Sequence, residues 1–307
     1  KKNVNIFVLH PDNRVSPVQR KLMTTGKDEN VFNIAIKGNF DDCQNLVKSM
    51  FADKKFSNDI KMSGVNSINW ARIIAQSVYY FYSYLLIEDT SKPTNFSVPT
   101  GNFGDVYAGY LAKKMGLPIN KLIVATNQND ILHRAISKGS YEAEKVSETI
   151  SPSMDIQIAS NFERLIFDLN NGDDQQTSLD MKNIKENGQY LINEDKLNKI
   201  SENFLSARMS EDETLEVIKN VYEKFAVVLD PHTAIGYGAF DKHNLKGNNI
   251  VLATAHPCKF SDAIQSAINV KADLPNELTL ILDQKENYDI VENDVEKVKE
   301  HIKERAK

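Results

Sequence analysis

The segment NFSVPTGNFGDVYAGY, residues 95–110, reads in succession as a strand, a turn bracketed by two glycines and the start of a helix. Glycine lets the backbone approach a ligand closely and adopt positive φ angles. The free N–H groups of a first helical turn, together with the positive end of the helix dipole, favour a bound anion. Asp105 is well placed as the N-cap or first-turn residue. The segment therefore predicts a strand, a turn and a helix of an α/β protein, with a phosphate site at the turn.

The composition is that of an ordinary globular protein, because 41% of the 307 residues are hydrophobic and 26% are charged. The formal net charge of −5 provides no basic field to attract nucleic acid or an anionic membrane. Cys43 and Cys258 lie far apart without Cys/His ligand spacing, which indicates neither a disulfide framework nor a metal site. The longest apolar run, near residues 78–87, is too short to span a bilayer. We therefore expect a cytoplasmic protein that binds neither nucleic acid nor membrane.

Short apolar runs alternate with helical patterns along most of the chain, as is typical of mostly parallel sheets wrapped by helices. Buried strands are predicted at residues 4–9, 31–36, 122–126 and 249–254. Ligands of such sheets bind at the carboxyl ends of the strands. Thr100 and Thr126 both lie at such ends.

Composition and periodicity divide the chain into three predicted parts. Residues 1–62 are expected to be the remainder of a small α/β domain, and residues 63–160 together with 226–307 a larger one. Residues 161–225 are charged and rich in Asn and Lys, which predicts a helical insertion. Because the chain begins without methionine and enters an interior strand at once, we expect part of the small domain to lie upstream of residue 1.

A long amphipathic helix is predicted over residues 67–87. Its apolar face would include Ile74 and Val78. The aromatic run YYFY at residues 79–82 suits the core, and it also suits the contact of a homodimer.

Four motifs resemble, in the same order along the chain, those of the threonine synthase family of fold-type II pyridoxal-phosphate enzymes. They are NSINWAR at 66–72, PTGNFGD at 99–105, DPHTAIG at 230–236 and TAHPCKF at 254–260. RVSPVQ at 14–19 and SPSMD at 151–155 extend the resemblance over nearly the whole chain. The resemblance implies the tryptophan synthase β-like fold of that class.

The resemblance also implies the conversion of O-phosphohomoserine and water into L-threonine and phosphate, with pyridoxal 5'-phosphate as cofactor. The residues that match the binding site of the cofactor phosphate are Gly101, Asn102, Phe103, Gly104 and Asp105. Thr254 matches the hydroxyl partner of the pyridine nitrogen. A neutral hydroxyl does not force protonation of the ring as a carboxylate would.

The substrate phosphate calls for a guanidinium with hydroxyl and amide donors. The polar helix entry formed by Asn66, Ser67, Asn69 and Arg72 suits this role. An alternative stays open, in which Ser67 only caps the helix and Arg72 faces solvent. His232 and His256 are interpreted as groups that shape loops near the site, with acid–base catalysis as the alternative.

The lysine that carries the cofactor in this family lies, by the resemblance, before the residues of this chain. No catalytic residue is therefore assigned, Lys259 is given no such role, and the chain by itself is expected to be inactive. A second hypothesis is a truncated, non-catalytic homologue that binds a phosphate ligand or a partner. A nucleotide-binding enzyme is disfavoured, because the chain lacks the glycine-rich nucleotide signatures.

Overall fold

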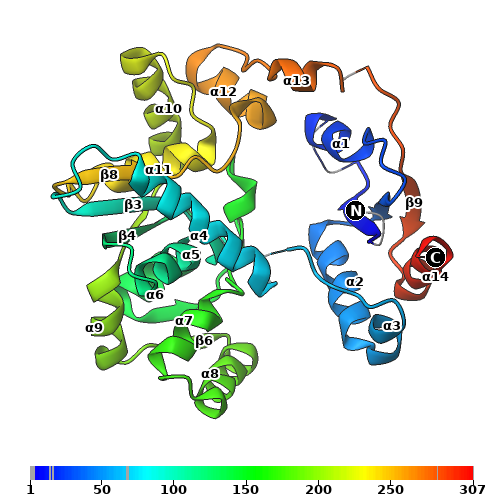
Figure 1. Cartoon of the computed structure of the whole chain (residues 1–307), viewed down its shortest axis with the longest axis horizontal. Helices are drawn as coiled ribbons and strands as arrows, with labels where there is room; N and C mark the ends of the chain where they lie inside the picture. The colour runs from blue at the N-terminus through cyan, green and yellow to red at the C-terminus, as the bar shows by residue number, and fades with distance from the viewer. Residues whose placement is uncertain (1–3, 14, 16, 67–68, 282, 307) are drawn as a thin grey trace. The chain divides into compact units, whose positions relative to one another are not determined.

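The computed structural model describes residues 4–13, 15, 17–66, 69–281 and 283–306. The chain folds into two compact units. One is the continuous segment Val65–Ala272, and the other combines Lys1–Gly64 with Asp273–Lys307. Helices flank a parallel sheet within each unit (Figure 1), which confirms the predicted α/β class.

The larger unit carries most of the helices and strands. In chain order they are α4 Trp70–Leu85, β3 Thr94–Pro99, α5 Gly104–Lys114, β4 Ile119–Thr126, α6 Ile131–Lys138, β5 Ser140–Glu142, the 3-10 helix Pro152–Met154, α7 Phe162–Leu169, α8 Asp174–Asn187, β6 Gln189–Leu191, α9 Glu194–Asn203, β7 Phe204–Arg208, α10 Glu211–Phe225, α11 Pro231–Asp241, β8 Asn248–Val251, the 3-10 helix Pro257–Phe260 and α12 Ser261–Ile268.

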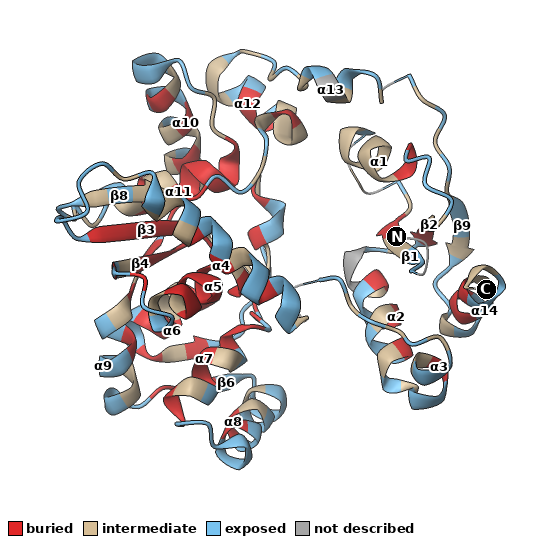
Figure 2. Cartoon of the chain, in the orientation of Figure 1, coloured by how far each residue is buried: buried red, intermediate tan, exposed pale blue. Residues whose placement is uncertain are grey.

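The main sheet of this unit is parallel, with the strand order β7-β4-β3-β8. At its centre Phe96 lies beside Leu122 on one neighbour and Ile250 on the other. Every residue of β3 is buried (Figure 2). The strand is covered on both faces although half of its residues are polar, because the buried side chains of Asn95 and Ser97 are hydrogen-bonded to Asn249 and to the carbonyl of Gly236. The carboxyl ends of β3 and β8 therefore meet at one edge of the sheet.

Helix α5 follows β3 after the glycine turn, as predicted, and it is buried on most of its surface. A β-carbon at Gly109 would collide with the ring of Tyr80 on α4 and with Leu122 on β4. The missing side chain thus lets α5 lie close to both elements. This packing holds the start of α5, and the turn before it, in a fixed place.

Helix α4 is shorter than predicted and buries a different face. It begins after Asn69, and its buried side chains are Ile73, Ser77 and Tyr80. Val78, expected to be buried, is 61% exposed. The helix is apolar on more than one side, so periodicity alone could not select the face that packs. Within the described part of the chain, no helix is both long and apolar enough to cross a membrane.

The segment 161–225 is not a purely helical insertion. Its strand β7 pairs with β4 from Leu122↔Phe204 to Thr126↔Arg208 and extends the main sheet. Helices α7 to α10 do account for most of the segment. The strand was missed because Phe204–Arg208 is short and lies between charged helices.

The smaller unit contains a parallel sheet with the order β1-β2-β9. Its elements are β1 Ile6–Pro11, α1 Pro17–Thr24, β2 Val31–Lys37, α2 Phe40–Ala52, α3 Lys54–Asp59, α13 Asn276–Thr279, β9 Asp289–Glu292 and α14 Val295–Arg305. Assigning all of residues 226–307 to the larger domain was therefore wrong for the last part. β9 pairs with β2, and Val298 and Ile302 of α14 join the core around Ile34 and Ile36. Such distant pairing leaves no local pattern in the sequence.

Candidate functional site

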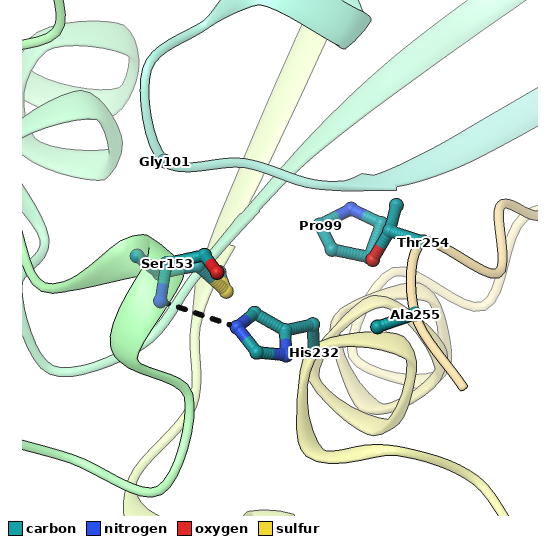
Figure 3. A pocket seen from close by; sticks show the side chains of 7 residues that line it. Pro99, Gly101, Ser153, His232, Thr254 and Ala255 are labelled. Atoms are coloured by element: carbon teal, nitrogen blue, oxygen red, sulfur yellow. Dashed lines mark hydrogen bonds between the residues drawn. The ribbon is translucent and has the colours of Figure 1, made fainter. Parts of the chain in front are cut away.

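A cavity of about 150 Å³ lies in the larger unit where β3 and β8 end (Figure 3). It is lined by Pro99, Gly101, Ser153, Met154, His232, Thr254 and Ala255. These residues come from the end of β3, the 3-10 helix Pro152–Met154, the first turn of α11 and the segment after β8. Two residues predicted for opposite ends of the cofactor, Gly101 and Thr254, thus lie on the same cavity.

Close approach explains the glycine at position 101. A β-carbon there would lie 2.5 Å from the carbonyl oxygen of Ser153. The residue with positive φ in the turn is not a glycine but Phe103, with φ 64° and ψ 5°. This corrects the expectation that the glycines supply the left-handed conformation. Phe103 tolerates it because its ring is fully buried and packs edge-on against Phe162, with centroids 5.2 Å apart.

Asn102 connects the turn to the segment before α7. Its side-chain oxygen accepts hydrogen bonds from the backbone N–H and the hydroxyl of Ser160. Its backbone carbonyl accepts from the side chain of Asn161 at 3.1 Å. These bonds give the turn a defined shape that does not depend on glycine flexibility.

Asp105 lies in the first turn of α5, as predicted, but it does not line the cavity. Its carboxylate accepts a hydrogen bond from the hydroxyl of Tyr80 at 3.2 Å. Burial raises the pKa of Asp105 to about 6, and the bond from Tyr80 opposes this rise. A carboxyl with a raised pKa would repel an anion at the predicted phosphate turn less than an ordinary aspartate would.

Of the predicted substrate residues that the structure describes, Asn66, Asn69 and Arg72 lie in or just before the first turn of α4 and not among the residues that line the cavity. The side chain of Asn69 accepts from the backbone N–H of Ala71 at 2.9 Å, so Asn69 is the N-cap. Arg72 donates to the carbonyl of Val65 at 3.1 Å. Asn66 is exposed, and Ser67 falls outside the described residues.

The segment SPSMD at 151–155 contributes Ser153 and Met154 to the cavity, a role that the sequence does not predict. Asp155 holds this segment, because its carboxylate accepts from the side chains of Asn127 at 2.7 Å and Asn129 at 2.9 Å. It also accepts from the backbone N–H of Thr149 at 2.8 Å. The segment thereby presents Ser153 to the cavity. Its only sequence signal was the cluster of small polar residues around a proline.

His232, on the first turn of α11, is buried and lines the cavity. Its Nδ1 lies 3.0 Å from Oδ1 of Asp230, and its Nε2 accepts from the backbone N–H of Ser153 at 3.3 Å. His256, by contrast, caps the 3-10 helix Pro257–Phe260 by accepting from the N–H of Cys258. Burial raises the pKa of the Cys258 thiol, which disfavours a nucleophilic thiolate there.

A second hollow, of about 460 Å³, lies along strand β7. It is lined by His133, Ser206, Ala207, Arg208, Glu213, Lys242 and His243. Lys242 already pairs with Glu213 at 2.7 Å, and Arg208 lies 3.6 Å from Asp130. The cationic side chains of Lys242 and Arg208 are therefore paired with carboxylates, so the hollow has no unpaired charge from these two residues to attract an ionic ligand.

Residues 233–302 match the family model described as threonine synthase, C-terminal. The chain is 45% identical over 303 residues to the threonine synthase of Pseudomonas aeruginosa, an alignment that covers 98% of this chain and 65% of the relative. It is also 45% identical to the threonine synthase of Saccharomyces cerevisiae, again over 65% of that relative. The chain belongs to the threonine synthase family. It spans about two thirds of the length of these family members.

Solved threonine synthase structures share this fold. A crystal structure of the pyridoxal-phosphate-bound enzyme from Brucella melitensis superimposes with a TM-score of 0.94 at 46% identity, covering 99% of this chain and 66% of that one. The yeast threonine synthase structure gives 0.90 at 43% identity. The predicted fold class is thereby confirmed.

The threonine synthase resemblance predicted that the cofactor lysine is absent from this chain. Of the described residues, those that line the cavity include no lysine. Lys259 lies in the 3-10 helix Pro257–Phe260 and is likewise not among the residues that line the cavity. The structure thus gives no reason to assign this role to Lys259.

Proposed function

We propose that this chain provides the cofactor site of a threonine synthase, which converts O-phosphohomoserine and water into L-threonine and phosphate with pyridoxal 5'-phosphate. The supporting observation is that Gly101 and Thr254 line the same cavity. Such an enzyme is a carbon-oxygen lyase that acts on a phosphate ester. When bound, pyridoxal phosphate withdraws electrons from the substrate carbons.

The residues present fit this cofactor. Gly101 lines the cavity, and the carbonyl oxygen of Ser153 lies 2.5 Å from where a β-carbon would be, so only a residue without a side chain fits between Ser153 and the turn. The N-terminus of α5 follows immediately and favours a phosphate group. Thr254 offers a neutral hydroxyl, which suits a pyridine nitrogen that is not forced to carry a proton. Gly101, Asn102, Phe103, Gly104 and Asp105 would hold the phosphate end, and Thr254 the ring.

Binding of the cofactor tests this assignment. Replacing Gly101 with alanine places a β-carbon against the backbone of Ser153, so we expect the affinity for pyridoxal phosphate to fall at least about tenfold. Gly26→Ala is the matched control, because an added β-carbon there meets nothing within 4 Å. Equal affinities of the two variants would refute the site.

Turnover separates the proposal from the non-catalytic alternative. The complete protein that contains this chain should release phosphate from O-phosphohomoserine. Cofactor binding without phosphate release would instead favour the phosphate-binding homologue. Borohydride reduction followed by peptide mapping tests whether the cofactor lysine lies upstream, because a labelled lysine within residues 1–307 would contradict that expectation.

For the substrate phosphate we retain Asn66, Ser67, Asn69 and Arg72 as the proposed donors. A guanidinium with amide and hydroxyl groups matches a dianionic phosphate. Replacement of Arg72 with lysine keeps the charge but loses the bidentate geometry. In the complete protein this variant should raise KM for O-phosphohomoserine, and an unchanged KM would remove Arg72 from the proposed set.

We also propose a cytoplasmic location for the protein. A separate proposal is a homodimer contact through the exposed apolar face of α4. Tyr82 is 65% and Leu85 77% exposed. Replacing both with serine should shift the mass measured by light scattering from dimer to monomer. Leu191→Ser is the control, because Leu191 is 70% exposed on β6, away from this helix. A monomeric parent protein would exclude the contact.

A further inference from the structure

Asp230 is a buried carboxylate that no substrate or cofactor assignment uses. It is 1% exposed and caps the N-terminus of α11, where its Oδ1 accepts from the backbone N–H of His232 at 2.9 Å. Its two oxygens also contact two side chains, His232 and Thr233. Each of these side chains contacts a different wall of the cavity.

The first contact fixes the tautomer of His232. The backbone N–H of Ser153 is a donor, so the Nε2 atom that it approaches at 3.3 Å must be an acceptor. Neutral imidazole carries one N–H, which then resides on Nδ1 and donates to Oδ1 of Asp230 at 3.0 Å. Figure 3 shows the bond between His232 and Ser153 at the edge of the cavity. The Nε2 lone pair is therefore already in use and is not available to take a proton from a ligand.

The second contact fixes the hydroxyl of Thr233. This hydroxyl donates its proton to Oδ2 of Asp230, and its oxygen accepts from the backbone N–H of Thr254 at 3.4 Å. A hydroxyl has one proton, so donation to Asp230 leaves the lone pair directed to Thr254. One carboxylate thus orients both bonds.

The two contacts lead to opposite ends of the predicted cofactor site. Ser153, held by His232, is the residue whose carbonyl faces Gly101. Thr254, held by Thr233, is the predicted partner of the pyridine nitrogen. The ring of Phe260 packs against the imidazole of His232, with 4.8 Å between the ring centroids.

We propose that Asp230 is a positioning residue that sets the spacing of the two cavity walls, through Nδ1-protonated His232 on one side and Thr233 on the other. His232 is then a fixed hydrogen-bond acceptor for the backbone and not a general acid or base. The effect on cofactor affinity rests on the proposed function. The tautomer of His232 does not, because it follows from protein contacts alone.

The tautomer is measured first, on the chain without cofactor. Nitrogen-15 NMR of the imidazoles at neutral pH should show His232 neutral and protonated on Nδ1. The His232→Asn variant identifies its signals among the six histidines, because one set disappears. A neutral ring protonated on Nε2, or an imidazolium, would overturn the proposal whether or not the chain binds pyridoxal phosphate.

Variants test the positioning role. Asp230→Asn keeps the shape and can still accept from His232 through its amide oxygen, but its NH2 group cannot accept from the hydroxyl of Thr233, so it should keep the Nδ1–H tautomer and weaken pyridoxal-phosphate affinity about tenfold. Thr233→Val removes one contact and should weaken affinity severalfold, whereas Thr233→Ser restores it. Asp241→Asn, exposed at the end of the same helix, should leave both readouts unchanged.

Failure of this inference is distinguishable from failure of the proposed function. If the parent chain binds no pyridoxal phosphate, the cofactor proposal fails and the NMR result alone decides the role of Asp230. If Asp230→Asn does not fold, Thr233→Val and Thr233→Ser decide it. Parental affinity in Thr233→Val would overturn the positioning role.

Discussion

In the turn between β3 and α5, a phenylalanine adopts the left-handed conformation that is usual for glycine, and a glycine is required for lack of space and not for its φ angle. Phe103 adopts the left-handed conformation, and the cost of about 1 kcal/mol is offset by burial of a large aromatic ring. Gly101 is required by the backbone of Ser153 and not by its own φ angle. Backbone strain held by surrounding packing is a feature of ligand sites.

Asp105 provides a prediction at this scale. Its pKa rises from 3.8 in the unfolded chain to about 6 on folding, so the folded state is disfavoured once the group ionises. The associated stability is present below pH 4 and lost as the pH rises through 6. Asp105→Asn should therefore be more stable than the parent at pH 7.5, by up to about 3 kcal/mol. The advantage should shrink towards pH 4.5.

Urea unfolding at several pH values measures this difference. Asp241→Asn serves as the exposed control and should not show the same growth with pH. An advantage of Asp105→Asn that is independent of pH would show that the carboxyl does not titrate in this range.

At the scale of elements, the ends of helices carry the site. Helix α11 begins at the cap Asp230, and α5 begins at the glycine turn, and both starts lie at the carboxyl edge of the main sheet. Helix α5 begins there because β3 has just ended, whereas α11 follows α10, and its start lines the same cavity through His232. The start of α4 is set by Asn69 in the same way.

The cap of α4 is tested by Asn69→Ala. Loss of the side-chain acceptor for the N–H of Ala71 should reduce the free energy of unfolding by about 1 kcal/mol. Asn69→Ser retains an acceptor and should recover most of this loss. Chemical denaturation gives both values, and an Ala variant as stable as the parent would contradict the role of Asn69 as the cap.

At the scale of the whole molecule, the smaller unit is built from both ends of the chain. β2 pairs with β9, and Ile302 on α14 is 3% exposed in the core of that unit. Ile302→Ala should cost about 2–5 kcal/mol in that unit. Hydrogen exchange should show lost protection in β2 while β3 is unchanged. Glu300→Ala, exposed on the same helix, is the control. Equal loss of protection in β3 would show that the units do not unfold separately.

The sequence was sufficient for features encoded locally. The strand, turn and helix around Gly101 follow from adjacent residues, and Gly101 and Thr254 lie on the predicted edge of the sheet. Their motifs also identified the family. These features could be predicted because parallel strands place their carboxyl ends together.

The remainder depends on contacts that a linear pattern does not carry. Which face of α4 packs was decided by Gly109 on α5, which accepts the ring of Tyr80. The cavity wall at Ser153 depends on Asp155 and on His232, 79 positions away. Strand β9 carries no apolar pattern of its own, and only its pairing with β2 reveals its place.

The pairing of β2 with β9 also has a consequence for folding during synthesis, because the two strands are made near the beginning and the end of this chain. Synthesis proceeds from the N-terminus at about 5–20 residues per second, and domains generally fold as units during it. The ribosome completes Val65–Ala272 before it adds Asp289. The unit with the cavity therefore has all its strands at a time when β9, the partner of β2, has not yet been made. Nascent β2 is an open sheet edge throughout that interval, and its unpaired N–H and C=O groups can pair with another chain until β9 is made.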